Sequence, residues 1–128
     1  MKKVWILAVL TLLFAACQES LEDRCEREVK ELTAKRCPMV LDSNTTMDSI
    51  TFDRNTHTLH YYYRLTGAAD RGDLLEKTNA AETLRQGLKN NTETQIYKDN
   101  KYNFTYTFRS ERDPKKIWFE VTFTDKDY

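Results

Sequence analysis

The sequence predicts an α+β fold, in which an antiparallel sheet of four to five strands is packed on one face by two helices. Two observations lead to this prediction. Apolar residues recur at helical spacing over residues 21–35 and about 73–89, and they alternate with polar residues over 59–65 and over two runs of the last third. The predicted order is therefore helix, hairpin, helix, hairpin, and residues 21–128 are expected to form a single domain of ordinary size.

The first predicted helix has recognisable ends. Ser20 can cap its N-terminus, with Asp23 three residues later in a variant of the capping box. The helix is expected to end near Arg36, because Pro38 disfavours helical geometry at the residue before it. Its apolar face carries four residues at helical spacing: Leu21, Cys25, Val29 and Leu32.

A polar loop and the first hairpin are predicted next. Residues 39–46 are rich in Asp, Ser, Asn and Thr, which favours a loop. A strand containing Ile50 and Phe52 then turns at residues 53–56 into a second strand. The apolar face of this second strand consists of Leu59, Tyr61, Tyr63 and Leu65.

The second helix and the last hairpin complete the predicted domain. Asp73 is a fair N-cap for a helix that reaches about Lys89, and its apolar face carries Leu74, Ala81, Leu84 and Leu88. A further short strand over residues 95–98 is an open alternative. The final hairpin alternates apolar and polar residues on both strands, as half-buried sheets do. Its apolar residues are Tyr102, Phe104, Tyr106, Phe108, Ile117, Phe119, Val121 and Phe123.

Two of the three cysteines lie in the predicted domain. If residues 21–35 are helical, Cys25 lies about 15 Å from the helix end, and a disulfide needs its Cα atoms within about 7 Å. Either the helix starts after Cys25, which would allow a bond to Cys37, or the two thiols are separate. We favour separate thiols, with Cys25 as a buried apolar residue.

Charge and composition argue against two classes of protein. Without Lys2 and Lys3, which precede the predicted domain, 18 basic residues stand against 20 acidic ones. This balance gives no basic footprint for nucleic acid. Aromatic residues make up 12% of the chain, which is too many for a disordered tail.

The sequence contains no recognisable catalytic constellation. The only histidines, His57 and His60, point to opposite faces of a flat strand, and a zinc site would need further ligands from elsewhere. Gly-x-Ser-x-Gly, phosphate-loop and dinucleotide motifs are missing. We therefore expect no enzyme activity, no metal and no cofactor. Asp48-Ser49-Ile50 resembles the O-glycosylation sequon of the Bacteroidota, which makes Ser49 a candidate for modification.

The polar face of the predicted sheet is the candidate binding surface. If the apolar residues from Leu59 to Leu65 face the core, the residues that alternate with them point outward, and the last hairpin adds others to the same side. Tyr, Trp and Arg are enriched in binding hot spots. The candidate residues are His60, Tyr62, Arg64, Arg109, Trp118 and Glu120. The alternative is a solvated or loop-covered face of ordinary strand residues.

Residues 1–16 have the three regions of a secretion signal. Two lysines come first, and the apolar stretch from Val4 to Phe14 is about half the roughly 20 residues that a membrane span needs. Ala15-Ala16 then supplies small residues directly before Cys17.

Leu13-Phe14-Ala15-Ala16-Cys17 resembles the lipobox of bacterial lipoproteins. The resemblance implies that Cys17 carries acyl chains, such as palmitate, which would anchor the protein in a lipid bilayer. Residues 17–20 then form the lipidated N-terminus and a short tether. By resemblance to the sorting rule of proteobacterial lipoproteins, Gln18 favours the outer membrane of the cell envelope, because Asp at this position would favour the inner membrane.

Three short stretches, Ala34–Met39, Met47–Ile50 and Leu59–Tyr63, resemble a group of small uncharacterised lipoproteins of the Bacteroidota. The resemblance implies a helix, a Cys-Pro junction, a hairpin, a second helix and a final hairpin, but no activity. We therefore expect a membrane-anchored, non-catalytic domain that binds a protein or an envelope ligand through the sheet face. The alternatives are an immunity-type inhibitor of a toxin or envelope hydrolase, a structural or accessory subunit of an outer-membrane complex, and a small envelope enzyme.

Overall fold

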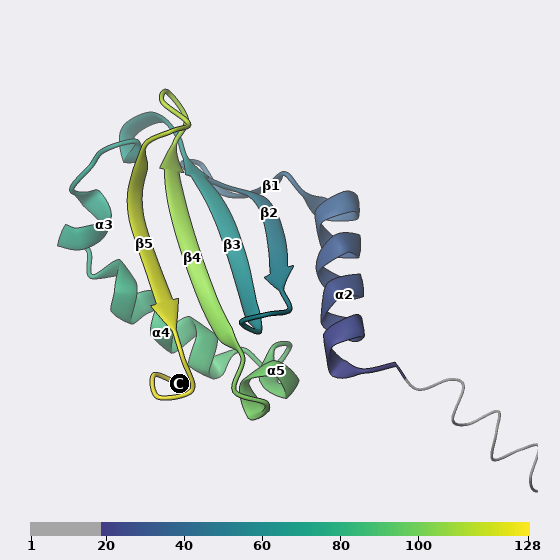
Figure 1. Cartoon of the computed structure of the whole chain (residues 1–128). Coiled ribbons are helices and arrows are strands. Elements are labelled where there is room, and N and C mark those ends of the chain that lie inside the picture. The colour runs from purple at the N-terminus through teal and green to yellow at the C-terminus, as the bar shows by residue number, and fades with distance from the viewer. Residues whose placement is uncertain (1–18) are drawn as a thin grey trace, which may run out of the picture.

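The computed structural model describes residues 19–128 (Figure 1). The predicted signal, residues 1–16, and the predicted lipid site Cys17 lie outside the described residues. Within the described part of the chain, no helix is both long and apolar enough to cross a membrane. The elements are α2 (Leu21–Arg36), β1 (Met39–Asp42), β2 (Thr45–Asp53), β3 (Thr58–Leu65), the 3-10 turn η1 (Gly67–Ala69), α3 (Leu74–Lys77), α4 (Ala80–Asn90), α5 (Gln95–Asp99), β4 (Asn103–Ser110) and β5 (Ile117–Phe123). The predicted α+β class is confirmed.

The strands form one mixed sheet of five strands in the order β1–β2–β3–β4–β5. The outer neighbours pair antiparallel, but β3 and β4 run parallel, with Tyr61 opposite Tyr106. The predicted purely antiparallel sheet is therefore wrong at its centre. Parallel neighbours need a long crossover connection, and residues 66–102 supply it with η1, α3, α4 and α5. Figure 1 shows α4 passing behind the strands, so the crossover covers one face of the sheet.

Helix α2 begins and ends where the sequence predicts. The side chain of Ser20 accepts a hydrogen bond from the Asp23 N–H at 3.1 Å, which confirms the cap. The position of α2 differs from the prediction, because it lies beside β2 and covers the edge of that strand as well as part of the core (Figure 1). The described domain therefore has α2 and the three α-helices of the crossover, which makes four α-helices where two were expected.

A side chain of α2 takes the place of a neighbouring strand at this edge. β1 pairs with β2 only as far as Met47, which leaves the backbone of Ile50 without a strand partner on that side. Thr33 Oγ1 accepts a hydrogen bond from the Ile50 N–H at 3.1 Å and donates one to the Ile50 carbonyl at 3.0 Å. This contact blocks an edge that would otherwise be open to pairing with another chain.

Two local predictions are wrong, and one open alternative does not occur. The stretch 39–46 contains the short strand β1 as well as a turn. The predicted helix over 73–89 is divided into α3 and α4, because Asn79 adopts a left-handed conformation with φ of 55°, which an α-helix does not accommodate. Residues 95–98 lie in the helix α5, so the strand left open there does not form.

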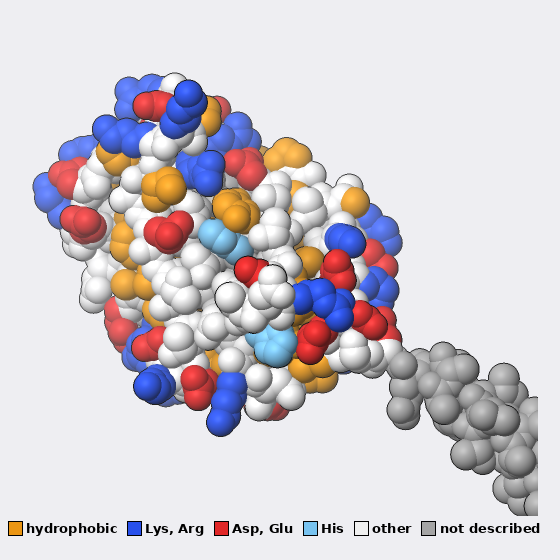
Figure 2. Space-filling view, viewed as in Figure 1, with side chains coloured by type: hydrophobic (Ala, Val, Ile, Leu, Met, Phe, Trp, Pro, Cys, Tyr) orange, Lys and Arg blue, Asp and Glu red, His pale blue; other side chains and the backbone are white. Residues whose placement is uncertain are grey.

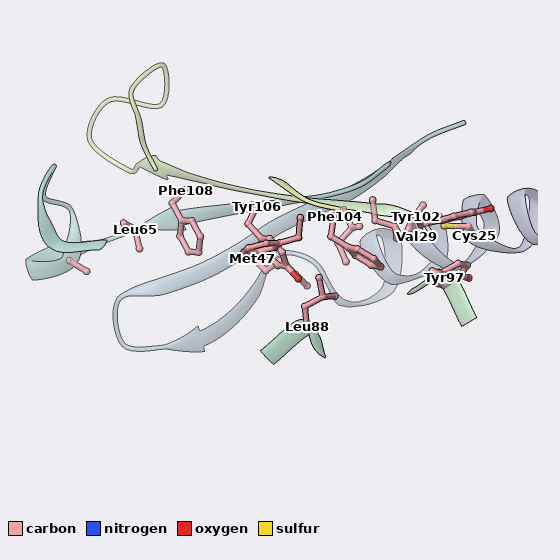
Figure 3. Packing of buried hydrophobic residues seen from close by; sticks show 14 residues of the cluster. Cys25, Val29, Met47, Leu65, Leu88, Tyr97, Tyr102, Phe104, Tyr106 and Phe108 are labelled. Atoms are coloured by element: carbon pink, nitrogen blue, oxygen red, sulfur yellow. The ribbon is translucent and has the colours of Figure 1, made fainter. Parts of the chain in front are cut away.

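The core fills the space between the sheet and the helices (Figure 3). Phe104, Tyr106 and Phe108 of β4 point to the helical side, where Leu88 of α4 meets them. Cys25 is fully buried beside Tyr97 and Tyr102 at the α2 end of the core, and burial raises the pKa of its thiol to about 12.

Both thiols of the described domain are free. Cys25 is buried in the core, whereas Cys37 follows the end of α2 and is half-buried. The preference for separate thiols is therefore confirmed, and Cys25 acts as a small apolar core residue.

The edge contact of Thr33 can be tested by substitution. Thr33→Val should lower the free energy of unfolding by about 1–3 kcal/mol, because the Ile50 N–H and carbonyl both lose their partner while the volume of the side chain is nearly kept. Equilibrium unfolding in urea measures the difference. Thr33→Ser retains the hydroxyl and should stay closer to the wild type, and equal losses in the two variants would contradict the proposed role of the hydroxyl.

Candidate binding face

We define the open face as the side of β3, β4 and β5 that faces away from the crossover helices. Figure 2 views the molecule from this side, and the histidines are visible on it. On β3, Leu59 and Leu65 are buried toward the core, and His60, Tyr62 and Arg64 alternate with them and are half-buried. Arg109 of β4 and Glu120 of β5 are exposed. The structure thus brings five of the six candidate residues onto one surface.

A chain of hydrogen bonds crosses the open face from β3 to β5. The Tyr62 hydroxyl lies 3.0 Å from His60 Nδ1, and His60 Nε2 lies 2.6 Å from the hydroxyl of Thr107. Thr107, which is fully buried, donates a hydrogen bond to Glu120 Oε2 at 2.6 Å. Strand register makes this chain, because Tyr62 is opposite Thr107 and Thr107 is opposite Glu120.

The direction of each hydrogen bond in this chain can be assigned. Thr107 has one proton and gives it to Glu120, so it can only accept from His60. His60 therefore carries its proton on Nε2, and its Nδ1 accepts from the Tyr62 hydroxyl. Burial lowers the pKa of His60, with Arg109 acting in the same direction and Glu120 opposing it. The neutral imidazole that this arrangement requires is thus the favoured form.

Aromatic stacking holds the exposed end of this chain. The rings of His60 and Tyr62 stack with centroids 4.0 Å apart, and the guanidinium of Arg109 lies 5.7 Å from the centre of the Tyr62 ring. A cation over a tyrosine ring is attracted by the negative face of the ring. Tyr62 and Arg109 are therefore held in place by contacts within the protein.

Arg64 stands next to Arg109 across the parallel pair of strands. Its guanidinium contacts Asp48 at 3.3 Å and Glu111 at 3.6 Å. Its Nε is buried and has no hydrogen-bond partner among the described residues. Arg64 thus keeps donor capacity that the described part of the protein does not use.

Trp118, the sixth candidate, makes contacts within the fold. Its indole N–H donates to Asp70 Oδ1 at 2.7 Å, and its ring lies so close to Gly72 that a Cβ there would be 2.6 Å from a ring carbon. Asp70 is almost fully buried and also accepts hydrogen bonds from the backbone N–H and the Nε of Arg112. These donors hold the pKa of Asp70 far below its usual range. Trp118 therefore fixes the loop after β3, and its indole N–H already has a partner within the fold.

The remaining sequence candidates do not join the open-face chain. Ser49 is half-buried on β2 opposite Tyr62, and its glycosylation stays a prediction. His57 lies in the β2–β3 turn, where its Nε2 is 3.3 Å from Glu22. Within residues 19–128, no group of three or more His, Cys, Asp or Glu side chains is placed to hold a metal ion.

Comparison with known proteins gives one family and one similar structure. A family model for a domain of unknown function (DUF8479) matches residues 20–119. A crystal structure of a "putative secreted protein" from Pseudomonas aeruginosa has the same fold, with a TM-score of 0.65. The match covers 86% of this chain and 98% of the Pseudomonas chain. Because the sequence identity is 12%, this likeness concerns the fold alone. No curated protein matches the chain.

The lowered pKa of His60 predicts a pH dependence of stability. Between the folded pKa and the usual value of about 6.5, the unfolded chain binds more protons than the folded one, so stability falls as the pH drops through this window. His60→Gln should remove this component and give a flatter curve. Urea unfolding between pH of about 7.5 and 5.5 measures the slope, since the lowered carboxyl pKa values, such as that of Asp70, act at lower pH. A His60 titration midpoint at or above 6.5 by NMR would contradict the assignment.

Proposed function

The chain belongs to the DUF8479 family of domains of unknown function, and we propose that it is a non-catalytic binding domain anchored to the bacterial envelope, which engages a protein or envelope ligand through the open face. The observation that carries the proposal is the preorganised row of Tyr62, His60, Thr107 and Glu120, with Arg109 over the tyrosine ring.

The chemistry of this row suits recognition. Arg109 and Glu120 present opposite charges at the exposed ends, and Tyr62 offers its hydroxyl oxygen as an acceptor after donating to His60. Tyr and Arg are among the residues that contribute most to binding energy. Because they are held on a rigid sheet, little side-chain freedom remains to be lost when a ligand binds.

The expected location rests on the N-terminal sequence. The lipobox-like stretch before Cys17 predicts an acyl anchor, and α2 begins at Leu21, which leaves only a short tether between the lipid and the domain. The similarity in fold to a protein described as secreted supports a place outside the cytoplasm. Gln18 supports the outer membrane as the site of anchoring.

Lipidation of Cys17 can be tested by metabolic labelling. Cells that express the wild-type protein and receive an alkyne analogue of palmitate should yield a labelled protein in the membrane fraction. Cys17→Ser should abolish both the label and the sedimentation with membranes, because it removes the acceptor sulfur. Cys37→Ser is the matched control and should keep both. A labelled Cys17→Ser protein would contradict the proposed anchor site.

Binding through the open face can be tested by photocrosslinking in intact cells. A photoreactive amino acid replaces Thr122, which is exposed on the open face of β5, or Lys126, which is exposed beyond the end of β5. The proposal expects a discrete adduct from position 122 and none from position 126.

A charge reversal then locates the contact. Arg109→Glu should reduce the adduct about tenfold, since loss of a paired charge costs about 1.4 kcal/mol or more. Lys126→Glu makes the same change of charge elsewhere and should leave the adduct unchanged. Equal adducts from both positions, or an adduct that is indifferent to Arg109→Glu, would count against a binding role for the open face.

A further inference from the structure

A pocket of about 350 Å³ lies on the side of the sheet opposite the open face. Its floor is the inner surface of β2 and β3, with Met47, Ile50, Leu59 and Tyr61. One wall is α2, and the other is the segment from Asn91 to Tyr97, at the end of α4 and in α5. In Figure 3, Cys25, Val29 and Tyr97 are grouped at the α2 end of this region, and Met47 projects from the sheet.

The arrangement of the helices explains why the space is left open. Thr33 ties α2 to the edge of β2, and on the same side of the sheet the crossover helix α4 passes behind the strands (Figure 1). The inner surface of β2 and β3 is therefore covered from two sides by elements that do not close over it. Tyr61 and Met39 are only partly buried for this reason.

The interior of the pocket is apolar and carries no free charge. Burial keeps the thiol of Cys25 protonated. The carboxylate of Glu28 accepts hydrogen bonds from the Tyr97 hydroxyl at 2.6 Å and from Arg24 at 2.8 Å, so its charge is already compensated. A pocket of this size and lining matches the usual description of a small-molecule site.

Two charged side chains, Arg36 and Glu93, lie on opposite walls of the pocket. Arg36, in the last turn of α2, lines the pocket and is exposed, and within the described chain its guanidinium forms no ion pair or hydrogen bond. Glu93 lies on the opposite wall. Arg36 is thus the cation at the mouth with all its donors available, and a guanidinium pairs well with a carboxylate.

We propose that this pocket binds a single acyl chain whose anionic head group pairs with Arg36. At about 30 Å³ for each water-sized group, the volume accommodates about twelve heavy atoms, which corresponds to a fatty acid of medium length. The chain lies on Leu32, Met39 and Tyr61, the partly buried apolar residues of the lining, and the carboxylate stays at the exposed end of α2. The site is separate from the open face and does not depend on the function proposed for it.

Laurate, displaced by fluorescent cis-parinarate, is the probe that tests this site. The Cys17→Ser protein, exported behind a cleavable leader, provides the chain from residue 17 onward without an acyl chain of its own. Laurate should bind saturably with one site per chain, and dodecanol, which has the same chain and no charge, should bind about tenfold more weakly, because the pairing with Arg36 is lost.

Three variants separate the chain from the head group. Arg36→Glu should weaken laurate about tenfold or more and change dodecanol by less than about twofold, whereas Lys35→Glu, the same change of charge one residue away and outside the pocket lining, should change neither. Leu32→Trp, which fills the pocket from α2, should abolish binding of both probes, with circular dichroism showing that the fold is kept.

The outcomes are decisive in each case. Saturable laurate binding that is lost in Leu32→Trp and selectively weakened in Arg36→Glu supports the site. Absence of saturable binding, or binding unchanged by Leu32→Trp in a folded protein, overturns it. Equal binding of dodecanol and laurate, or equal effects of Arg36→Glu and Lys35→Glu, overturns the pairing with Arg36. Failure of the open-face experiments would leave all these results unaffected.

Discussion

Adjacent parallel strands cannot be joined by a tight turn, so the pairing of β3 with β4 obliges the chain to leave one end of the sheet and return to the other. Residues 66–102 make this return, and α4 of this segment passes behind the strands (Figure 1). The other side of β3, β4 and β5 then has no helix to pack against. Its side chains must satisfy one another or water, and the row from Tyr62 to Glu120 is the result. The open face and the covered core thus have a common origin in one strand pairing.

The parallel pairing of β3 with β4 could not be predicted from the sequence, and the reason is physical. Parallel strands are usually buried on both faces and read as continuous apolar runs. Here Tyr62 and Arg64 on β3, and Thr107 on β4, keep the alternation of half-exposed antiparallel strands. Period-2 alternation therefore predicted the strands and their inner faces but not their direction. The break in the second helix was hidden in a similar way, because Asn79 rather than glycine adopts the left-handed conformation there.

For the candidate site, alternation predicts which side chains share a face, whereas only the strand register shows which of them are in contact. Alternation alone predicts that His60, Tyr62 and Arg64 share a face, and the structure places them so. It cannot show that Thr107 links His60 to Glu120, because that depends on which residues stand opposite each other across two strand pairs. It also cannot show that Trp118 is engaged by Asp70, since the loop that carries Asp70 is distant in sequence. The pocket was unpredictable for a further reason, because it depends on how α2 and α5 are placed.

The three consecutive tyrosines of β3 alternate between the open face and the pocket side of the same strand. Tyr62 points to the open face, and Tyr61 lines the pocket and stacks on Tyr106, with ring centroids 4.9 Å apart. Tyr63 stacks on Phe108 at 4.6 Å, which fixes the strand from the inner side. Coupling between two sites requires an element with two arrangements, each favoured by one ligand. β3 is hydrogen-bonded to β2 on one side and to β4 on the other, and its rings are stacked, so a second arrangement would break many contacts at once. Two ligands on opposite sides of this strand should therefore bind independently, which makes β3 a rigid wall shared by two sites rather than a path between them.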